Sequence, residues 1–254
     1  MPAPVNRMKA RLAARERSIG CWLGMVSAYT AEIATTAGFD WLLIDGEHAP
    51  NDLQTLTAQM QIVDASPADA IIRLPMDAPW LFKQVLDAGA QSLLIPMVES
   101  AEQARAIVRA TRYPPDGIRG IGSALARASE FNNIPDYLTT AHDQICLIAQ
   151  VETRAGLDAI EEIAAVDGID ALFIGPSDLA ADLGHIGKPT APEVETAIAD
   201  AIGRIHASGK AAGILSLDRA YGQKHLDMGI EMLGVGVDVL TLAQGLRRIV
   251  ADWR

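Results

Sequence analysis

The stretch Trp41-Leu42-Leu43-Ile44-Asp45-Gly46-Glu47-His48 joins an apolar run to residues that can carry protons. Its first four side chains are large and apolar, as in a strand that is buried on both faces. The next four residues are an acid, a glycine, a second acid and a histidine. We interpret the stretch as a buried strand that ends at a catalytic edge of the fold.

Four later apolar runs also end in residues that suit a functional edge. They are Ile71-Ile72-Arg73, Cys146-Leu147-Ile148-Ala149-Gln150-Val151-Glu152, Ala171-Leu172-Phe173-Ile174 before Gly175-Pro176-Ser177-Asp178, and Gly213-Ile214-Leu215-Ser216. Functional side chains collected at the carboxyl ends of successive strands are typical of parallel α/β proteins, and above all of the (β/α)₈ barrel.

The spacing of the apolar runs predicts eight strands separated by helices. The strands are expected at residues 19–23, 41–44, 70–73, 92–95, 146–151, 171–174, 211–215 and 232–235. Divided among eight strand–helix units, the 254 residues give about 32 residues each, which suits this fold. No linker or second core interrupts the pattern. We therefore predict a single α/β domain over residues 1–254, folded as a (β/α)₈ TIM barrel.

Two segments are less regular or less certain in their packing. From Tyr113-Pro114-Pro115 to about Ile134 the sequence shows no clear periodicity. A long irregular segment of this kind more often has a function or takes part in an oligomer interface than has no role. The last helix carries Leu240, Leu242, Leu246 and Val250, and the sequence leaves open whether it packs on its own barrel or on another subunit.

Composition and charge exclude several classes of protein. The net charge of −11 argues against nucleic acid, which a binding protein would meet with a basic face. No apolar run is long enough to cross a bilayer, and no apolar stretch follows the basic N-terminal residues as a secretory signal requires. We expect a cytoplasmic protein that acts on a small molecule.

Glu152 and Asp178 are the predicted metal ligands. They lie one strand–helix unit apart, so they are expected at the mouths of neighbouring strands, where two carboxylates can share a divalent ion. Oxygen ligands with room for water suit Mg²⁺ or Mn²⁺. The alternative is that Glu152 pairs with Arg154 on the surface and that Asp178 caps a helix.

Arg73, Gln150 and His48 could act on a keto acid bound at that metal. Arginine in a barrel mouth can stabilise an oxyanion or hold a carboxylate, and the alternative is an ion pair with a nearby acid. Gln150 either points into the site or satisfies a buried backbone group. His48 follows a strand directly, with Asp45 and Glu47 within reach. A carboxylate partner would fix its tautomer and raise its basicity, and we assign that role to Asp45. Together these groups predict proton abstraction next to a carbonyl, through an enolate.

At this point the sequence resembles the metal-dependent (class II) pyruvate aldolases, typified by 4-hydroxy-2-oxoheptanedioate aldolase. The resemblance covers nearly the whole chain. It depends on motifs at residues 39–50, on Tyr113-Pro114-Pro115 with Gly117-Ile118-Arg119-Gly120, and on the segments 123–128, 150–154 and 173–179.

The resemblance implies a (β/α)₈ barrel that assembles as a homohexamer and swaps its last helix between subunits. It implies reversible cleavage of 4-hydroxy-2-oxo acids to pyruvate and an aldehyde, with a divalent cation (Mg²⁺, Mn²⁺ or Co²⁺) as cofactor. By residue, it implies that His48 is the proton acceptor, Arg73 the transition-state stabiliser and Asp87 an acid that raises the basicity of the histidine. Glu152 and Asp178 correspond to the family's metal ligands. Gln150, Ser177 and Asp178 correspond to the positions that bind the keto acid in the family. We also assign Leu215 to substrate binding.

Two departures from the family pattern concern substrate choice. Ser177 stands where close relatives often have alanine, and its hydroxyl could favour a more polar donor such as hydroxypyruvate. Arg73-Leu74-Pro75 differs from the arginine-proline of some relatives. Two alternatives to an aldolase stay open: a lyase acting on a CoA thioester, which needs a basic groove that the sequence does not show, and a non-catalytic keto-acid-binding barrel.

Overall fold

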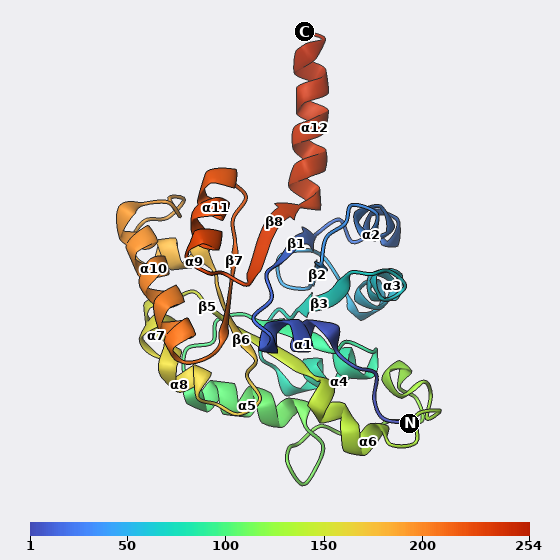
Figure 1. Cartoon of the computed structure of the whole chain (residues 1–254). Helices are drawn as coiled ribbons and strands as arrows, with labels where there is room; N and C mark the ends of the chain where they lie inside the picture. The colour runs from blue at the N-terminus through green and yellow to red at the C-terminus, as the bar shows by residue number, and fades with distance from the viewer.

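Eight parallel strands close into a barrel in a computed structural model that describes residues Met1–Arg254 (Figure 1). Each strand pairs with the next along the chain, and β8 pairs with β1. The strands are β1 (Ser18–Leu23), β2 (Trp41–Asp45), β3 (Asp69–Arg73), β4 (Ser92–Ile95), β5 (Cys146–Val151), β6 (Ala171–Ile174), β7 (Ala211–Leu215) and β8 (Met232–Val237). The predicted barrel is confirmed, and β4, β5, β6 and β7 have the predicted bounds.

Helices separate the strands and surround the barrel. They are α1 (Arg7–Ala13), α2 (Ala28–Thr35), α3 (Leu53–Asp64), α4 (Pro79–Asp87), α5 (Ala101–Thr111), α6 (Tyr137–Thr140), α7 (Arg154–Asp158), α8 (Ile160–Ala164), α9 (Pro176–Asp182), α10 (Pro192–Ala207), α11 (Arg219–Asp227) and α12 (Asp238–Asp252). Two 3₁₀ helices, η1 (Arg127–Ser129) and η2 (Ala141–Gln144), lie between α5 and β5. The aperiodic excursion from Tyr113 to about Ile134 thus contains only η1.

The interior of the barrel is a packed apolar core. Alternate residues of each strand point inward, and this cluster includes Trp22, Trp41, Leu43, Ile71, Ile148 and Phe173. Met8 and Leu12 of α1 belong to the same cluster, so α1 closes the end of the barrel where the strands begin. A larger apolar cluster fills the space between strands and helices. Only the end where the strands finish is left for polar chemistry.

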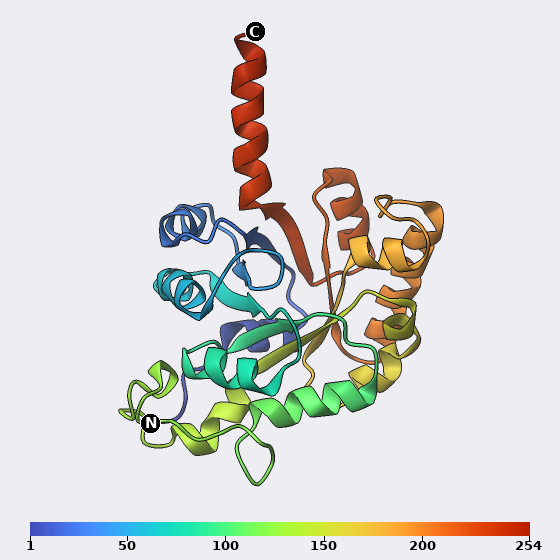
Figure 2. The same ribbon diagram turned by 180° about the vertical axis from the view of Figure 1, so that it is seen from behind.

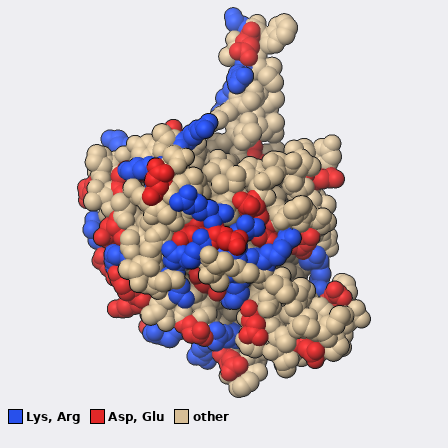
Figure 3. Space-filling model, viewed as in Figure 1, with Lys and Arg blue, Asp and Glu red and all other residues tan.

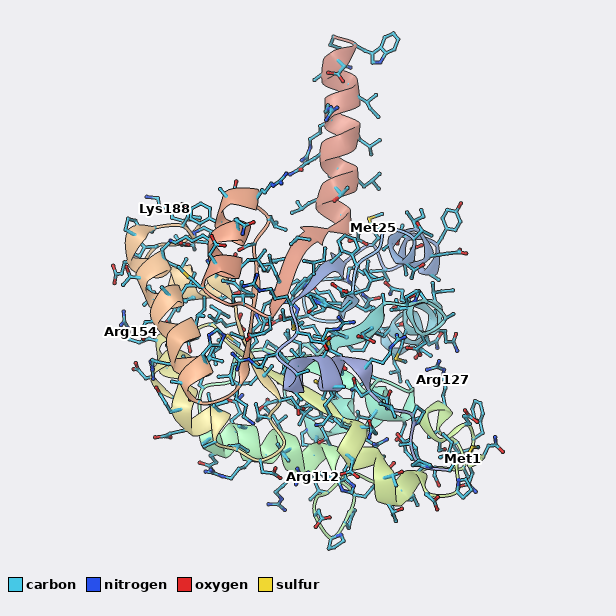
Figure 4. All side chains as sticks on the ribbon, in the orientation of Figure 1. Met1, Met25, Arg112, Arg127, Arg154 and Lys188 are labelled. Carbon is cyan, nitrogen blue, oxygen red and sulfur yellow. The ribbon has the colours of Figure 1, made fainter.

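The last helix does not pack on its own barrel. α12 leaves the end of β8 and projects away from the molecule (Figures 1 and 2). None of its side chains is buried, and Figure 4 shows them extending into open space. Apolar side chains recur at a spacing of three or four residues and form one stripe: Val239, Leu242, Leu246, Ile249 and Trp253.

Charges of both signs lie on the surface of the barrel. Figure 3 shows acidic and basic side chains interspersed over the face seen in Figure 1. None of the helices combines the length and the apolar character that a membrane span would need.

Candidate active site

Polar side chains replace apolar ones at the last inward-facing positions of three strands. The inward series of β2 ends with Asp45, and that of β3 ends with Arg73. Along β5 the series continues to Gln150, and Glu152 follows one pleat later. The strand-end residues of the sequence analysis are therefore brought together at one end of the barrel, above the apolar interior.

Asp45 and Arg73 form a buried ion pair with two hydrogen bonds. The parallel register of β2 and β3 sets these two residues side by side. Nε of Arg73 lies 2.8 Å from one carboxylate oxygen of Asp45, and Nη2 lies 2.6 Å from the other. Burial opposes ionisation of Asp45, yet hydrogen bonds and charge from Arg73 hold its pKa below the usual value. Arg73 is thus fixed in place by its neighbour.

The turn after β2 places Glu47 and His48 beside this pair. Oδ1 of Asp45 accepts hydrogen bonds from the backbone N–H groups of Glu47 and His48, at 3.0 and 3.4 Å. The N–H of Gly46 donates to the carbonyl of Arg73 at 2.9 Å, and a Cβ on Gly46 would lie 2.6 Å from that oxygen. Only glycine permits so close an approach.

The acid beside the imidazole of His48 is Glu47 and not Asp45. Nε2 of His48 lies 3.7 Å from Oε2 of Glu47, and 66% of the His48 side chain is exposed. Both oxygens of Asp45 already bond to Arg73. The expectation that Asp45 pairs with the His48 ring is therefore not met within this chain. Asp45 instead holds the backbone that carries the histidine.

Gln150 and Glu152, at the end of β5, belong to the same site, since the charge of Glu152 acts on Arg73. Glu152 is 2% exposed, and its Oε1 accepts a hydrogen bond from the N–H of Met97 at 2.9 Å. Nε2 of Gln150 donates to the other carboxylate oxygen of Glu152. Oε1 of Gln150 is buried without a hydrogen-bond partner. Glu152 is not on the surface with Arg154, and Gln150 points into the site.

The missing side chain of Gly175 makes room for Glu152. Gly175 occupies the inward position that follows β6. A Cβ there would overlap Oε2 of Glu152 and would lie 2.8 Å from Nε2 of Gln150. The sequence analysis did not predict this role. The signal that could have shown it is the glycine two residues after the inward-facing Phe173, at the end of β6.

Three acids gather in the barrel mouth and repel one another. Burial raises the pKa of Glu152 to about 7; hydrogen bonds from Met97 and Gln150 oppose the shift, whereas the charges of Asp178 and Glu47 add to it. Burial likewise raises the pKa of Glu47. Asp178 lies in the exposed first turn of α9 with no hydrogen-bond partner. Such a cluster is stabilised by a cation.

The residues fit a divalent metal ion, held mainly by two acids. No group of three or more His, Cys, Asp or Glu side chains is arranged to hold an ion alone. Glu152 and Asp178 would supply the charge, and Gln150, whose amide donates to Glu152, has an unpartnered Oε1. Mg²⁺ and Mn²⁺ commonly keep vacant or water-filled positions, which a substrate can take.

Ser177 and Leu215 stand at the rim of this site. Ser177 is exposed beside Asp178 in the first turn of α9. Leu215 ends β7 on the inward side and packs on the apolar interior, half-buried. Both positions are compatible with contact to a bound substrate, which stays a prediction for each.

Asp87 lies elsewhere. It ends α4, just before β4 begins, so it is near the opposite end of the barrel from His48. Its Oδ1 accepts a hydrogen bond from Nη2 of Arg119 at 2.6 Å. Arg119 is fully buried, and its guanidinium lies 4.5 Å from the ring centre of Tyr113. The structure does not bring Asp87 to the histidine of the same chain.

Two cavities lie away from the barrel mouth. One, of about 440 Å³, is lined by the N-terminal segment and by the beginnings of β3 and β4. The other, of about 540 Å³, lies between α3 and α4 and includes Asp87. Neither is lined by Arg73, His48 or Glu152. We place the active site at the barrel mouth because the ionisable and unpartnered polar groups gather there.

Comparison with known proteins gives full-length relatives. The chain is 58% identical to a hydroxypyruvate/pyruvate aldolase from Roseovarius nubinhibens over 254 residues, covering 100% of this chain and 99% of the relative. It is 50% identical to a 4-hydroxy-2-oxo-heptane-1,7-dioate aldolase from Klebsiella pneumoniae over 246 residues, covering 97% and 93%. These relatives confirm the prediction of an aldolase, a carbon–carbon lyase.

The fold has a close match among solved structures. A crystal structure of an HpcH/HpaI aldolase/citrate lyase family protein from Burkholderia cenocepacia superposes with a TM-score of 0.94 at 40% identity, covering 98% of this chain and 100% of that one. The sequence model of the HpcH/HpaI aldolase/citrate lyase family matches residues 18–244, from the first strand into the last helix. The chain belongs to the HpcH/HpaI aldolase/citrate lyase family.

Proposed function

We propose that this aldolase reversibly cleaves 4-hydroxy-2-oxo acids to an aldehyde and either pyruvate or hydroxypyruvate, and that it needs a divalent cation. The observation that carries the proposal is that charged groups gather at the carboxyl ends of neighbouring strands, in the barrel mouth. An arginine held by Asp45 and an exposed histidine lie at the ends of β2 and β3, while the buried Glu152 and the exposed Asp178 follow β5 and β6. The names of the full-length relatives support the same donors.

Arg73 would stabilise negative charge on the substrate. Asp45 holds its Nε and Nη2, which leaves Nη1 as the edge that faces further groups. When the C3–C4 bond of the hydroxy-keto acid breaks, the electron pair passes toward the C2 oxygen and an enolate forms. A positive charge fixed beforehand lowers the energy of that state without reorganisation.

His48 would move the proton. Its ring is exposed at the mouth, so it can reach the C4 hydroxyl of a bound substrate directly or through a water. Removal of the hydroxyl proton lets the C4 oxygen become the aldehyde as the bond breaks. Return of a proton to C3 of the enolate then gives the keto acid.

Glu152 and Asp178 would hold the cation, for which Mg²⁺, Mn²⁺ and Co²⁺ are candidates. Such an ion supplies positive charge to the carboxylate and C2 oxygen of the keto acid. The amide of Gln150 and the hydroxyl of Ser177 would orient that end of the substrate, with Leu215 beside them. The buried amide already has a free acceptor, and the hydroxyl is exposed for contact.

The charge of the mouth disfavours a CoA thioester as substrate. Its phosphates would meet Glu47, Glu152 and Asp178, while the charge of Arg73 is already matched by Asp45. A keto-acid binder without catalysis would have no use for an exposed histidine placed beside this arginine. The aldolase names of the relatives agree with a catalytic site.

We further propose that the chain works as a homo-oligomer, a hexamer, joined in part through α12. No residue of α12 is buried, so its apolar stripe is exposed to solvent in the single chain. Packing against a second copy of the chain would bury this stripe. Asp87 could then act on His48 of a different subunit. The net charge of −11 and the mixed surface support a cytoplasmic enzyme of small molecules that binds neither nucleic acid nor membrane.

Proton exchange tests the function without knowledge of the aldehyde. Pyruvate is incubated with the protein in D₂O, and its methyl signal is followed by proton NMR, with Mn²⁺ or Mg²⁺ and then with EDTA. We expect loss of the signal only when metal is present. An aldehyde panel with pyruvate and hydroxypyruvate follows. No exchange with either donor at saturating metal would contradict the proposal.

A further inference from the structure

Glu47 is the one acid that touches both the arginine and the histidine of the site. Its Oε2 lies 2.8 Å from Nη1 of Arg73 and 3.7 Å from Nε2 of His48. The arginine contact is an ion pair rather than an aligned hydrogen bond, because Oε2 has no hydrogen-bond partner. The Glu47 side chain is 15% exposed, so the contact is only partly screened by water.

Asp45 cannot take this place. Its two oxygens are engaged by Nε and Nη2 of Arg73, and one of them also accepts the backbone N–H groups of the turn. Asp45 therefore fixes where the arginine is. It leaves the third nitrogen, Nη1, to another partner, and Glu47 supplies that partner.

We infer that Glu47 is a positioning residue that holds Nη1 of Arg73 and the His48 ring in one arrangement. The inference depends on the proposed function, in which these two groups act on the same substrate. A substrate oxygen that approaches Nη1 must share it with Glu47 or displace it. Glu47 thus keeps the histidine close to the point where the substrate oxygen arrives.

Burial and neighbouring acids oppose the negative charge of Glu47. Asp45 and Asp178 add negative charge beside it, whereas Arg73 and His48 favour its ionised form. The charge of Glu47 also contributes to raising the pKa of Glu152. Replacing Glu47 by glutamine would remove repulsion from the mouth while keeping the size of the side chain. Binding of an anion and catalysis should then respond in opposite directions.

The test compares proton exchange with binding of oxalate, a planar dianion that resembles the enolate of pyruvate. Both are measured at saturating Mn²⁺, with metal affinity determined separately for each variant. In Glu47→Gln we expect exchange to fall about 10- to 100-fold, because the histidine loses its anchor. We expect oxalate to bind at least as tightly as to the unchanged protein, because Nη1 loses a competing carboxylate.

Controls separate this result from other causes. Glu102→Gln makes the same chemical change at an exposed position of α5 and should alter neither quantity. If Glu47→Gln does not fold, Glu47→Asp gives the same separation, since its shorter carboxylate cannot reach both groups. Unchanged exchange, or oxalate affinity lost in proportion to exchange, would overturn the inference. Absence of exchange in the unchanged protein would instead count against the proposed function.

Discussion

Arg73 and Asp45 face each other across neighbouring strands, with two nitrogens of the guanidinium 2.8 and 2.6 Å from the two carboxylate oxygens. The pair is buried, so neither charge is free to reorient. A strand-end arginine could have been a catalyst or a structural partner. Here the ion pair orients the arginine, and Nη1 remains for other contacts.

Arg73→Lys should keep the charge but lose this geometry. An ammonium group cannot make the paired contact of a guanidinium. We expect proton exchange to fall about 100-fold or more, the size seen when one fixed oxyanion donor is lost. Arg105→Lys, at an exposed position of α5, is the matched control and should leave exchange unchanged. Normal exchange in Arg73→Lys would remove the arginine from the mechanism.

The metal-free protein should lose stability as the pH rises. Burial raises the pKa of Glu152 to about 7 from a usual value of 4.5. The folded state therefore binds more protons than the unfolded state between these values, and its stability falls as pH rises through this range, by up to about 3 kcal/mol. Urea unfolding in EDTA at pH 5 and pH 8 measures the difference.

Glu152→Gln is the control for that pH effect. Without the carboxylate, the fall in stability between pH 5 and pH 8 should shrink. The same variant should bind Mn²⁺ more weakly in a calorimetric titration, since a charged ligand is lost. An unchanged pH dependence together with unchanged Mn²⁺ affinity would exclude Glu152 as the ligand.

Gly175→Ala should disturb the site without straining the backbone. The φ angle of Gly175 is −94°, which alanine adopts readily, but its Cβ would overlap the Glu152 carboxylate. We expect weaker Mn²⁺ binding and slower exchange. Gly203→Ala is the control, because nothing lies within 4 Å of its added carbon on α10. That control should be neutral or stabilise by about 0.5–1 kcal/mol, as measured by thermal unfolding.

Ser177→Ala should change the choice of donor. If the exposed hydroxyl of Ser177 bonds the hydroxyl of hydroxypyruvate, its loss removes one neutral hydrogen bond, about 0.5–1.5 kcal/mol. The ratio of kcat/KM for hydroxypyruvate over pyruvate, with a common aldehyde, should then fall about 2- to 10-fold. An equal fall in kcat/KM for both donors would show that Ser177 does not contact the hydroxyl of hydroxypyruvate.

Charge placed on the apolar stripe of α12 should break the assembly. Leu246→Asp with Ile249→Asp puts two carboxylates on that stripe, where half or more of each side chain is exposed in the single chain. Light scattering after size-exclusion chromatography should show a smaller species than the unchanged protein. Gln244→Asp, on the opposite side of the helix, should not change the size. A monomeric unchanged protein would contradict the proposed oligomer.

The sequence by itself determined the barrel and most of the residues at its mouth. Buried parallel strands are short apolar runs, and their last residues must meet at one end of the barrel. This is why Arg73, Gln150 and Glu152 could be placed from their order alone. The apolar spacing of the last helix was also visible.

Only the tertiary structure decided how these groups are paired. Register set Asp45 beside Arg73 rather than beside His48, and so left Glu47 as the nearest acid to the histidine. Sequence spacing shows which face of a strand a residue occupies, but side-chain contacts depend on the neighbouring strand and on the turn that follows. For the same reason the sequence alone did not show that Gly175 leaves space for Glu152, which follows the neighbouring strand β5. The tertiary structure also decided that Asp87 lies far from His48 of its own chain and that α12 leaves its apolar stripe exposed.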